Sequence, residues 1–252
     1  MLPLSVVIIT LNEDKNIRRC LDSIREIADD VVVVDSFSSD RTEEICKEMG
    51  ARFIRHAFKG HIEQKNYALT QAAYPHVLSL DADEALSEEL KQSIRQAKSH
   101  WEMQGYYMNR LTNYCGTWIR HCGWYPDRKL RLFNSSKGNW GGINPHDKFC
   151  LHDGDTAAGW LKGNILHYSF RTRDEFRDRQ KHYAFLGAAE LHKKNAKAGW
   201  AHINLKPAVR FIRDYVIHAG FLDGRSGIVI SKTAAQAVYW KYSQLKKLNK
   251  TK

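Results

Sequence analysis

Residues 78–84 read Leu-Ser-Leu-Asp-Ala-Asp-Glu, an apolar run that ends in three acids. The run from His76 to Leu80 predicts a buried strand. Side chains two apart on an extended chain point to the same side, so Asp81 and Asp83 can face one point. Two carboxylates at one point repel each other unless a cation lies between them. Carboxylate oxygens suit Mg²⁺ or Mn²⁺, which complete their coordination with phosphate oxygens and water. The spacing therefore predicts a metal–diphosphate site.

The alternative for the same residues is an acidic turn that caps the next helix. Ser87 can already cap a helix over 88–97, with Glu88 and Glu89 in the first turn, where the helix dipole favours acids. The upstream acids are not needed as caps, and we favour the metal site.

The first hundred residues alternate apolar runs with amphipathic segments. We expect strands at 5–11, 31–34, 52–56 and 76–80, and helices over 17–27 and 61–73. A further helix is expected to begin at a capping box of Asp40 with Glu43 and to end at Gly50. Strands alternating with helices of this length imply an α/β fold with a largely parallel sheet and right-handed crossovers.

Polar side chains follow three of these strands: Thr10, Asn12 and Glu13 after the first, Asp35, Ser36 and Ser38 after the second, and Asp81 and Asp83 after the fourth. Ligands of such sheets bind beyond the carboxyl ends of the strands, so the three groups predict one site. Asp35 is placed to accept a hydrogen bond from a ribose hydroxyl or a uracil N–H. A nicotinamide site is disfavoured, because residues 10–13 stand where a GxGxxG turn would be.

Between residues 101 and 160 the chain is rich in aromatic residues and glycine, and strands of a mixed sheet are expected at 105–111 and 130–133. Lys129 and Arg131 alternate with two leucines, which places both cations on one face. That face either holds a diphosphate or is simply solvated. Three aromatic residues offer flat surfaces on which sugar rings stack, or else belong to the core: Trp118, Trp124 and Tyr125.

The net charge of +11 is concentrated in the last third of the chain. Residues 1–161 carry 20 Lys and Arg against 22 Asp and Glu, whereas residues 162–252 carry 19 against 6. This asymmetry predicts an anionic partner, either a membrane surface, a phosphorylated glycan or a nucleic acid. Amphipathic helices of this kind bind membrane interfaces or dock on their own domain. We expect helices at 174–195, 207–222 (with Pro207 in the first turn) and 227–248.

The five cysteines follow no regular spacing, and their odd number favours reduced thiols in a cytosolic setting. A zinc site among the Cys and His residues between 115 and 152 has no close CxxC pair to anchor it. No segment approaches the ~20 continuous apolar residues that span a bilayer. Residues 1–11 are apolar but lack a basic leading region, which predicts a strand and not a signal peptide.

Four motifs resemble those of family 2 glycosyltransferases of the GT-A fold: Ser5–Glu13 (SVVIITLNE), Val34–Thr42 (VDSFSSDRT), Gln64–Leu69 (QKNYAL) and Leu78–Glu84 (LSLDADE). Later segments resemble a narrower group, the bacterial lipopolysaccharide core β-glucosyltransferases: Lys129–Phe133, the glycine-rich loop Gly141–Asp147, Leu166–Tyr168 and Gly220–Gly224. The resemblance implies a Rossmann-like, mostly parallel sheet flanked by helices, with a helical C-terminal extension.

The resemblance also implies an inverting transfer of a hexose, glucose in the narrower group, from a UDP-sugar. The acceptor would be a hydroxyl of a lipid-linked or phosphorylated saccharide such as a lipopolysaccharide core, and the cofactor Mg²⁺ or Mn²⁺. Asp83 is then the main metal ligand, with Asp81 beside it, and Asp35 contacts the base and ribose. Asp147 is the candidate general base, and His146 would orient it or touch the phosphates. The family pair is usually His-Glu or Glu-Asp, so this His-Asp pair departs from it. The other residues expected to contact the nucleotide sugar are Thr10, Asn12, Glu13, Ser36, Lys65, Asn66, Asp81, Arg131 and His167.

We expect residues 1–100 to form the nucleotide-sugar-binding half, 101–165 the acceptor-side half, and 166–252 a basic helical region that associates with the membrane or docks on the domain. The enzyme would then lie in the cytoplasm, at the anionic inner face of the cytoplasmic membrane. Two enzymatic alternatives are transfer to another cell-envelope glycan and a phosphotransferase of the haloacid-dehalogenase type. The latter places its DxD after the first strand, not the fourth. A nucleic-acid-binding module would not explain three acidic strand ends, so no nucleic acid partner is expected.

Overall fold

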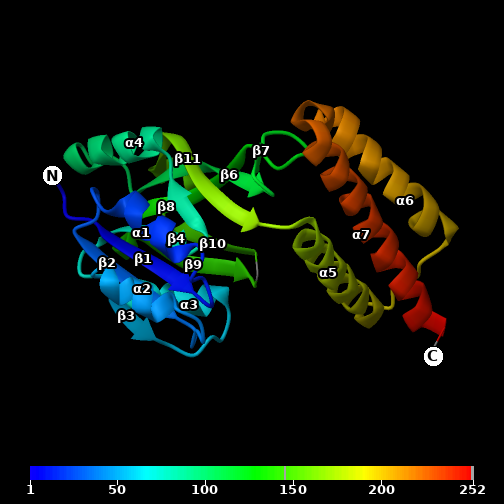
Figure 1. The fold of residues 1–252 in the computed structure, drawn as a ribbon, viewed down its shortest axis with the longest axis horizontal. Coiled ribbons are helices and arrows are strands. Elements are labelled where there is room, and N and C mark those ends of the chain that lie inside the picture. Colours follow the sequence, from blue (N-terminus) through cyan, green and yellow to red (C-terminus); the bar gives the residue numbers. More distant parts are fainter. Residues whose placement is uncertain (145, 251–252) are drawn as a thin grey trace. The chain divides into compact units, whose positions relative to one another are not determined.

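A mixed sheet dominates the first part of the chain in the computed structural model, which describes residues 1–144 and 146–250 (Figure 1). The strands are β1 (Ser5–Thr10), β2 (Asp30–Asp35), β3 (Arg52–Arg55), β4 (His76–Asp81), β5 (Glu84–Leu86), β6 (Gly105–Tyr114), β7 (Thr117–Ile119), β8 (Asp127–Asn134), β9 (Gly138–Ile143), β10 (His146–Leu151) and β11 (Ala158–Phe170). Their order is β3-β2-β1-β4-β8-β6-β11-β5, with β7 beside β6 and a separate β9–β10 pair. The first four strands are parallel, whereas the β4–β8, β8–β6 and β11–β5 pairs are antiparallel. The predicted α/β sheet is confirmed.

The helices are α1 (Ile17–Ile24), α2 (Thr42–Glu48), α3 (His61–Thr70), α4 (Glu88–Ser99), α5 (Arg173–Lys193), α6 (Trp200–Ile212) and α7 (Gly224–Lys250). The chain folds as two units. The first comprises Met1–Arg110 with Asp127–Tyr168, and the second comprises Leu111–Pro126 with Ser169–Lys252. The strands β6 and β11 therefore run from one unit into the other.

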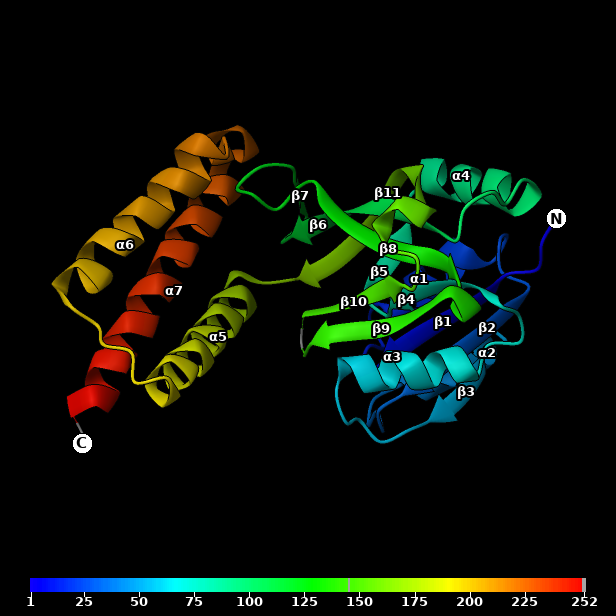
Figure 2. The same cartoon turned by 180° about the vertical axis from the view of Figure 1, so that it is seen from behind.

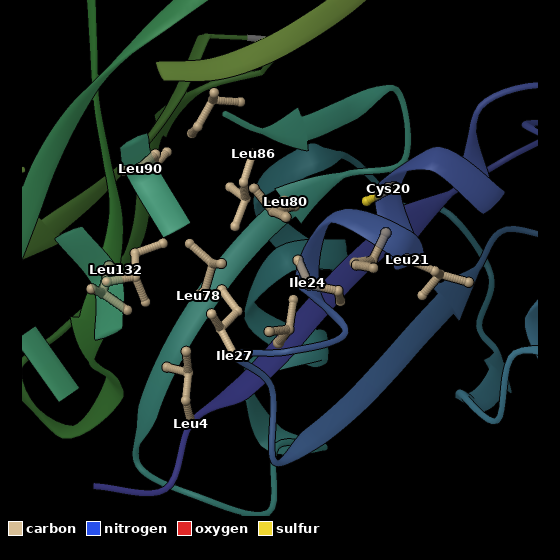
Figure 3. Close-up of a cluster of buried hydrophobic side chains, with 14 of the residues drawn as sticks. Leu4, Cys20, Leu21, Ile24, Ile27, Leu78, Leu80, Leu86, Leu90 and Leu132 are labelled. Atoms are coloured by element: carbon tan, nitrogen blue, oxygen red, sulfur yellow. The ribbon is translucent and has the colours of Figure 1, made fainter. Parts of the chain in front are cut away.

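Both faces of the parallel strands are covered, which explains their continuous apolar runs. On one face, Val6, Ile8 and Leu78 pack with residues of α1, α2 and α4. Figure 3 draws part of this cluster, including Leu78 of β4, Ile24 of α1 and Leu90 of α4. The apolar residues of the helix expected over 17–27 are buried there, although α1 itself ends at Ile24. On the other face, Val7 packs with residues of α3 and of the β9–β10 hairpin. Figure 2, seen from behind, shows α3 and this hairpin in front of the parallel strands.

Local capping signals fix two helix starts, one as predicted and one differently. The Ser87 side chain accepts a hydrogen bond from Leu90 N, as expected for the cap of α4. The Asp40–Glu43 capping box is wrong, because α2 begins at Thr42 and its N-cap is Arg41. Asp40 instead accepts hydrogen bonds from Thr42 N and, across two loops, from Asp14 N, each at 3.0 Å.

A β-bulge in β8 corrects the expected alternation around Arg131. Tyr106 pairs with Leu132 but the next residue, Tyr107, pairs with Leu130, so Arg131 is an extra residue in the ladder. Leu132 consequently packs in the core on one face of the sheet, and Leu130 in the core on the other. The prediction that two leucines share a face, with Lys129 and Arg131 on the opposite one, is therefore wrong. A bulge turns the side chain of the extra residue away from the regular alternation.

Residues 141–143 and 146–147 of the glycine-rich segment lie in two paired strands where the sequence predicted a loop. β9 and β10 pair antiparallel, with Asp147 opposite Gly142 and Phe149 opposite Trp140. Gly138 lies close to the facing strand, since a Cβ there would come within 2.3 Å of Cys150 O. Small residues therefore permit this close pairing and do not mark irregular chain.

The second unit is mainly helical, as predicted, although its segments divide differently. Pro207 lies inside α6, which begins at Trp200, so the prediction of a first-turn proline is wrong. The expected single helix over 207–222 becomes the end of α6, a π-helix (Arg213–Ile217) and a 3₁₀-helix (Gly220–Asp223). Trp124, considered for sugar stacking, packs against the core of this unit. No helix within residues 1–144 and 146–250 is long and apolar enough to cross a bilayer.

Candidate active site

The loops after β1 and β2 are tied together at the carboxyl edge of the sheet. Asp35 is fully buried, and its carboxylate accepts hydrogen bonds from Ser38 N at 2.7 Å and from the Ser38 hydroxyl. Asn12 N donates to Ser38 Oγ at 2.7 Å, and Asn12 Oδ1 accepts from Ser39 N at 2.8 Å. Asn12 has φ 55°, a left-handed conformation that asparagine tolerates well. The structure thus brings Asn12 and Asp35 into one small network.

Three further predicted residues lie at the same edge. Ser36 Oγ accepts from Gln64 Nε2 at 3.1 Å, which links the β2 loop to α3. Glu13 Oε2 accepts from Asn16 Nδ2 at 2.7 Å. Thr10 Oγ1 is buried and has no hydrogen-bond partner among the described residues. A buried hydroxyl without a partner is uncommon and marks a place where a ligand or water can complete the bonding.

Four charged side chains from four elements converge at the end of β4. Lys65 Nζ, on α3, lies 2.7 Å from Asp147 Oδ2 and 3.1 Å from Asp81 Oδ1. Arg131 Nη2, on β8, lies 2.9 Å from Asp81 Oδ2. The side chains of Lys65 and Arg131 are only 3% and 4% exposed. Each carboxylate oxygen of Asp81 therefore faces its own buried cation.

These contacts change the acidity of the cluster. Burial alone would raise the pKa of Asp81, but the charges of Arg131 and then Lys65 outweigh it and hold the pKa well below its ordinary value. Burial would likewise lower the pKa of Arg131, but Asp81 and Glu84 raise it. Asp81 is consequently ionised throughout the physiological range and Arg131 is always charged.

Two members of the cluster, Glu84 and Arg110, were not among the site residues predicted from the sequence. The Glu84 side chain is fully buried, and its Oε1 lies 3.4 Å from both Arg131 Nη2 and Arg110 Nη1. Its Oε2 accepts from Asp81 N at 2.9 Å, which fixes the end of β4. Arg110 Nη2 also lies 2.9 Å from Asp127 Oδ2. One feature of the sequence could have indicated Glu84: it is the third acid of the 78–84 stretch, and no basic residue stands near it in the sequence.

Trp140 provides an aromatic wall beside the two buried cations. Its ring centroid lies 4.6 Å from Lys65 Nζ and 5.4 Å from Arg131 Cζ, within cation–π range. Its edge contacts with Phe133 and Phe149 hold the ring in place. In the part of the chain that the structure describes, neither Trp140 Nε1 nor Arg131 Nη1 has a hydrogen-bond partner. Two buried donors are thus available to an acceptor such as a phosphate oxygen.

Asp83 contacts different partners from Asp81. β4 ends at Asp81, so Asp83 lies in a turn. Residues two apart on an extended strand point to the same side, but this rule therefore does not apply to Asp81 and Asp83. Asp83 Oδ2 lies 3.1 Å from His167 Nε2, and Asp83 O accepts from Tyr168 N at 2.8 Å. The Asp83 and His167 side chains are 21% and 15% exposed, enough to be reached by a ligand.

The side chains of Asp83 and His167 are suited to be the protein ligands of a divalent cation. A carboxylate oxygen suits Mn²⁺ and Mg²⁺ alike, whereas an imidazole nitrogen is accepted by Mn²⁺ more readily than by Mg²⁺; either ion leaves further positions to phosphate and water. No group of three His, Cys, Asp or Glu that could hold a metal occurs among residues 1–144 and 146–250.

The helix α3 holds the β9–β10 hairpin by contacts along its length. Asn66 Nδ2 donates to Trp140 O and Asn66 Oδ1 accepts from Trp140 N, both at 3.0 Å. Asn144 Oδ1 accepts from Ile62 N at 3.0 Å. Together with the Lys65–Asp147 pair, these contacts position the candidate base. Asn66 was predicted to bind the donor, but both polar atoms of its side chain form hydrogen bonds with the backbone of Trp140.

Three other acids between residues 101 and 160 have partners of their own, and one of them, Asp127, shares Arg110 with Glu84. Asp127 pairs with Arg110 and Lys129, Asp153 accepts from Gln104 Nε2 at 2.6 Å, and Asp155 accepts from Tyr107 at 2.8 Å. None of these contacts involves Lys65 or Asp81. The side chain of His146 lies outside the described residues.

Comparison with known proteins agrees with the motifs. A family model described as glycosyl transferase family 2 matches residues 5–150. An uncharacterised glycosyltransferase of Rickettsia typhi is 29% identical over 258 residues, covering 99% of this chain and 88% of its own. The lipopolysaccharide core biosynthesis glycosyltransferase LpsC of Rhizobium meliloti is 25% identical over 260 residues, covering 96% and 94%.

Among solved structures, glucosyl-3-phosphoglycerate synthase from Mycobacterium tuberculosis, in complex with Mn²⁺, UDP and glucosyl-3-phosphoglycerate, is similar at 22% identity and a TM-score of 0.36. The match covers 44% of each chain, so this chain spans less than half of that protein. The family model covers more than half of the present chain. The chain therefore belongs to glycosyl transferase family 2, and its mixed sheet flanked by helices agrees with the fold that the sequence motifs indicated.

Proposed function

We propose that this glycosyltransferase moves a hexose, glucose as the first candidate, from a UDP-sugar to a hydroxyl of a lipid-linked saccharide such as a lipopolysaccharide core. The observation that carries the proposal is the convergence of Asp81, Lys65, Arg131 and Asp147 beside the Asp83–His167 pair. The choice of acceptor is supported by the similarity to LpsC, whose name assigns it to lipopolysaccharide core synthesis.

In this proposal the donor lies along the carboxyl edge of the sheet. Asp35, with Asn12 and Thr10 beside it, accepts from the uracil or ribose. The buried Arg131 and Lys65 face the diphosphate, where two fixed cations stabilise the charge that grows as the sugar leaves. Arg131 Nη1 and Trp140 Nε1, which lack partners among the described residues, donate to the same phosphate oxygens.

Asp83 and His167 would hold a divalent cation, which supplies charge neutralisation at the leaving diphosphate when it is bound. Their side chains are already 3.1 Å apart, so little rearrangement is needed to present both to one ion. Asp81 acts beside them through Arg131 and Lys65, because both of its oxygens face those cations.

Asp147 is the proposed general base. It accepts the proton of the acceptor hydroxyl as that oxygen attacks the anomeric carbon and the bond to the diphosphate breaks. Asp147 Oδ2 lies 2.7 Å from Lys65 Nζ, so Lys65 has to move away from that oxygen, toward the diphosphate, before the oxygen can accept a proton. Lys65 is placed for that exchange, since it already bridges Asp147 and Asp81.

The proposal also assigns a role to each segment of the chain and a location in the cell. Residues 1–100 bind the donor, 101–165 face the acceptor, and the basic region 166–252 holds the enzyme at the inner, anionic face of the cytoplasmic membrane. A cationic region near such a surface concentrates an enzyme where a lipid-linked acceptor lies.

The test is a panel of nucleotide sugars incubated with the protein and Mn²⁺ or Mg²⁺, with release of the nucleoside diphosphate as readout. We expect UDP-glucose turnover, and a further increase when a truncated lipopolysaccharide core is added. Asp83→Ala, which should turn over no donor, is the negative control. Turnover of another UDP-hexose would change the donor, whereas no turnover of any nucleotide sugar would refute the proposal.

A further inference from the structure

An exposed row of apolar side chains runs along α6 and the π-helix that follows it. Leu205, Val209, Ile212 and Val216 are 52%, 63%, 52% and 56% exposed. Their spacing of four, three and four residues places them on one face of the helix. We call these four residues the apolar row. In Figures 1 and 2, α7 lies between α5 and α6, and α6 packs against α7.

A row of cations lies alongside the apolar row. Lys206, Arg210 and Arg213 each follow a member of the apolar row by one residue, so they occupy the neighbouring strip of the helix surface. Arg210 and Arg213 share the buried Asp214, which keeps both guanidinium groups beside the helix. The third cation, Lys206, donates a hydrogen bond from Nζ to the Tyr242 hydroxyl at 3.0 Å.

This part of the chain presents almost no negative charge to solvent. Between Lys197 and Lys250, all of which the structure describes, ten Lys and Arg accompany only two acids, Asp214 and Asp223. The side chains of both acids are buried, at 3% and 5% exposure, and both are paired, with arginines and with His121. The surface of α6 and α7 is therefore cationic and apolar without exposed carboxylates.

We propose that the apolar row inserts into the interface of an anionic phospholipid bilayer, with Lys206, Arg210 and Arg213 on the headgroup phosphates. This inference rests on the proposed function and assigns its membrane contact to one helix face. A helix with an apolar face and a basic flank lies in the interface plane, with its apolar side chains at the acyl boundary. A second copy of the chain would bring a like cationic row against this one, which is unfavourable. Nucleic acid would engage the cations but leave the apolar row in water.

The experiment is flotation of the full-length protein with vesicles of phosphatidylcholine alone or mixed with phosphatidylglycerol. We expect binding to the anionic vesicles that falls as salt rises. Val209→Ser with Ile212→Ser keeps the charge and should lower the partition coefficient by roughly tenfold or more, from the lost transfer of two large apolar side chains. The matched control is Tyr183→Ser with Leu186→Ser on α5, where both side chains are 50% exposed and binding should be unchanged. Lys206→Gln should weaken binding and its salt dependence, whereas Lys181→Gln on α5 should not.

Equal flotation of the wild type and the Val209–Ile212 variant would overturn the inference, as would equal binding to neutral and anionic vesicles. A lipid-free wild type that is dimeric, with a monomeric Val209–Ile212 variant, would show that a second copy covers the face and would overturn it as well. Donor turnover in lipid-free buffer separates this inference from the proposed function. The Val209–Ile212 variant should keep wild-type turnover, and a wild type that binds vesicles through the apolar row but turns over no nucleotide sugar would refute the function alone.

Discussion

Replacing Asp147 by Asn tests the candidate base and the ion pair that holds it. The substitution keeps the size of the side chain but removes the charge that faces Lys65 Nζ at 2.7 Å. Lys65 retains Asp81 Oδ1 at 3.1 Å, and the asparagine Oδ1 can still accept a hydrogen bond. The fold should therefore survive, while the proton acceptor is lost.

The contacts set the size of two separate effects. Losing a charge-assisted hydrogen bond whose donor keeps a second partner should cost about 1–3 kcal/mol of unfolding free energy. Lys65→Met takes the cation from Asp147, whose side chain is only 11% exposed, and from Asp81, and should cost more, about 3–5 kcal/mol. Because Asp147→Asn removes that uncompensated charge, the double variant should be more stable than the sum of the single effects predicts. Loss of a general base should lower kcat by roughly 10²–10⁴-fold.

The measurement combines thermal unfolding, donor binding by calorimetry, and turnover. For Asp147→Asn we expect donor affinity within a few-fold of wild type and a large fall in kcat, since a base acts in the transition state. Asp127→Asn and Asp153→Asn are the matched controls, because their carboxylates contact Arg110 with Lys129 and Gln104 instead. If Asp147→Asn turns over normally, or if one of the controls binds donor but does not transfer, the base has been assigned to the wrong residue. Additive stability losses in the double variant would contradict the Lys65–Asp147 pair.

Three further outcomes are expected. Asp83→Ala should lose Mn²⁺-dependent binding of UDP by calorimetry while its unfolding temperature stays near wild type, and metal-dependent binding that persists would place the cation elsewhere. The pKa of Asp81 is depressed in the fold, so its ionised form stabilises the protein above the pKa of about 3.9 in the unfolded chain, and this stabilisation is lost as pH falls toward the folded pKa. The difference in unfolding temperature between wild type and Asp81→Asn should therefore be present at neutral pH and shrink below about pH 4. A difference that does not depend on pH would argue against the ion pairs. A Cβ at Gly227 would lie 1.8 Å from Gly220 O, so Gly227→Ala should destabilise the helical unit by at least about 1–3 kcal/mol, whereas Gly199→Ala, whose Cβ would approach only His202 Nδ1 at 3.8 Å, should have little effect on thermal unfolding.

The parallel half of the sheet was predictable because its signals are local. The β-branched runs of β1 and β2, the apolar stripe of α1 and the Ser87 cap each lie within a few neighbouring residues. The polar strand ends were predictable for a related reason, since parallel strands deliver their carboxyl ends to one edge.

The ion-pair cluster was less predictable because its contacts are long-range. Lys65 meets Asp147, 82 positions away, and neither a helix pattern nor a strand pattern encodes that meeting. Arg131 was predicted to contact the nucleotide sugar, but its pairing with Glu84 was not predicted, and both side chains are buried because each supplies the other's partner. The bulge at Arg131 also has no local signature, since only the pairing with β6 reveals the extra residue.

The attachment of the β9–β10 hairpin to α3 suggests where an inhibitor could act. The hairpin is a two-stranded sheet of its own, separate from the main sheet, and it carries Asp147. Its polar ties to α3 run through Asn144, Asn66 and Lys65. A small molecule that displaced the Asn66 amide from the Trp140 backbone would loosen the strand pair that carries both the candidate base and the Trp140 ring. Such a compound would therefore impair proton transfer and donor binding together through a single polar contact.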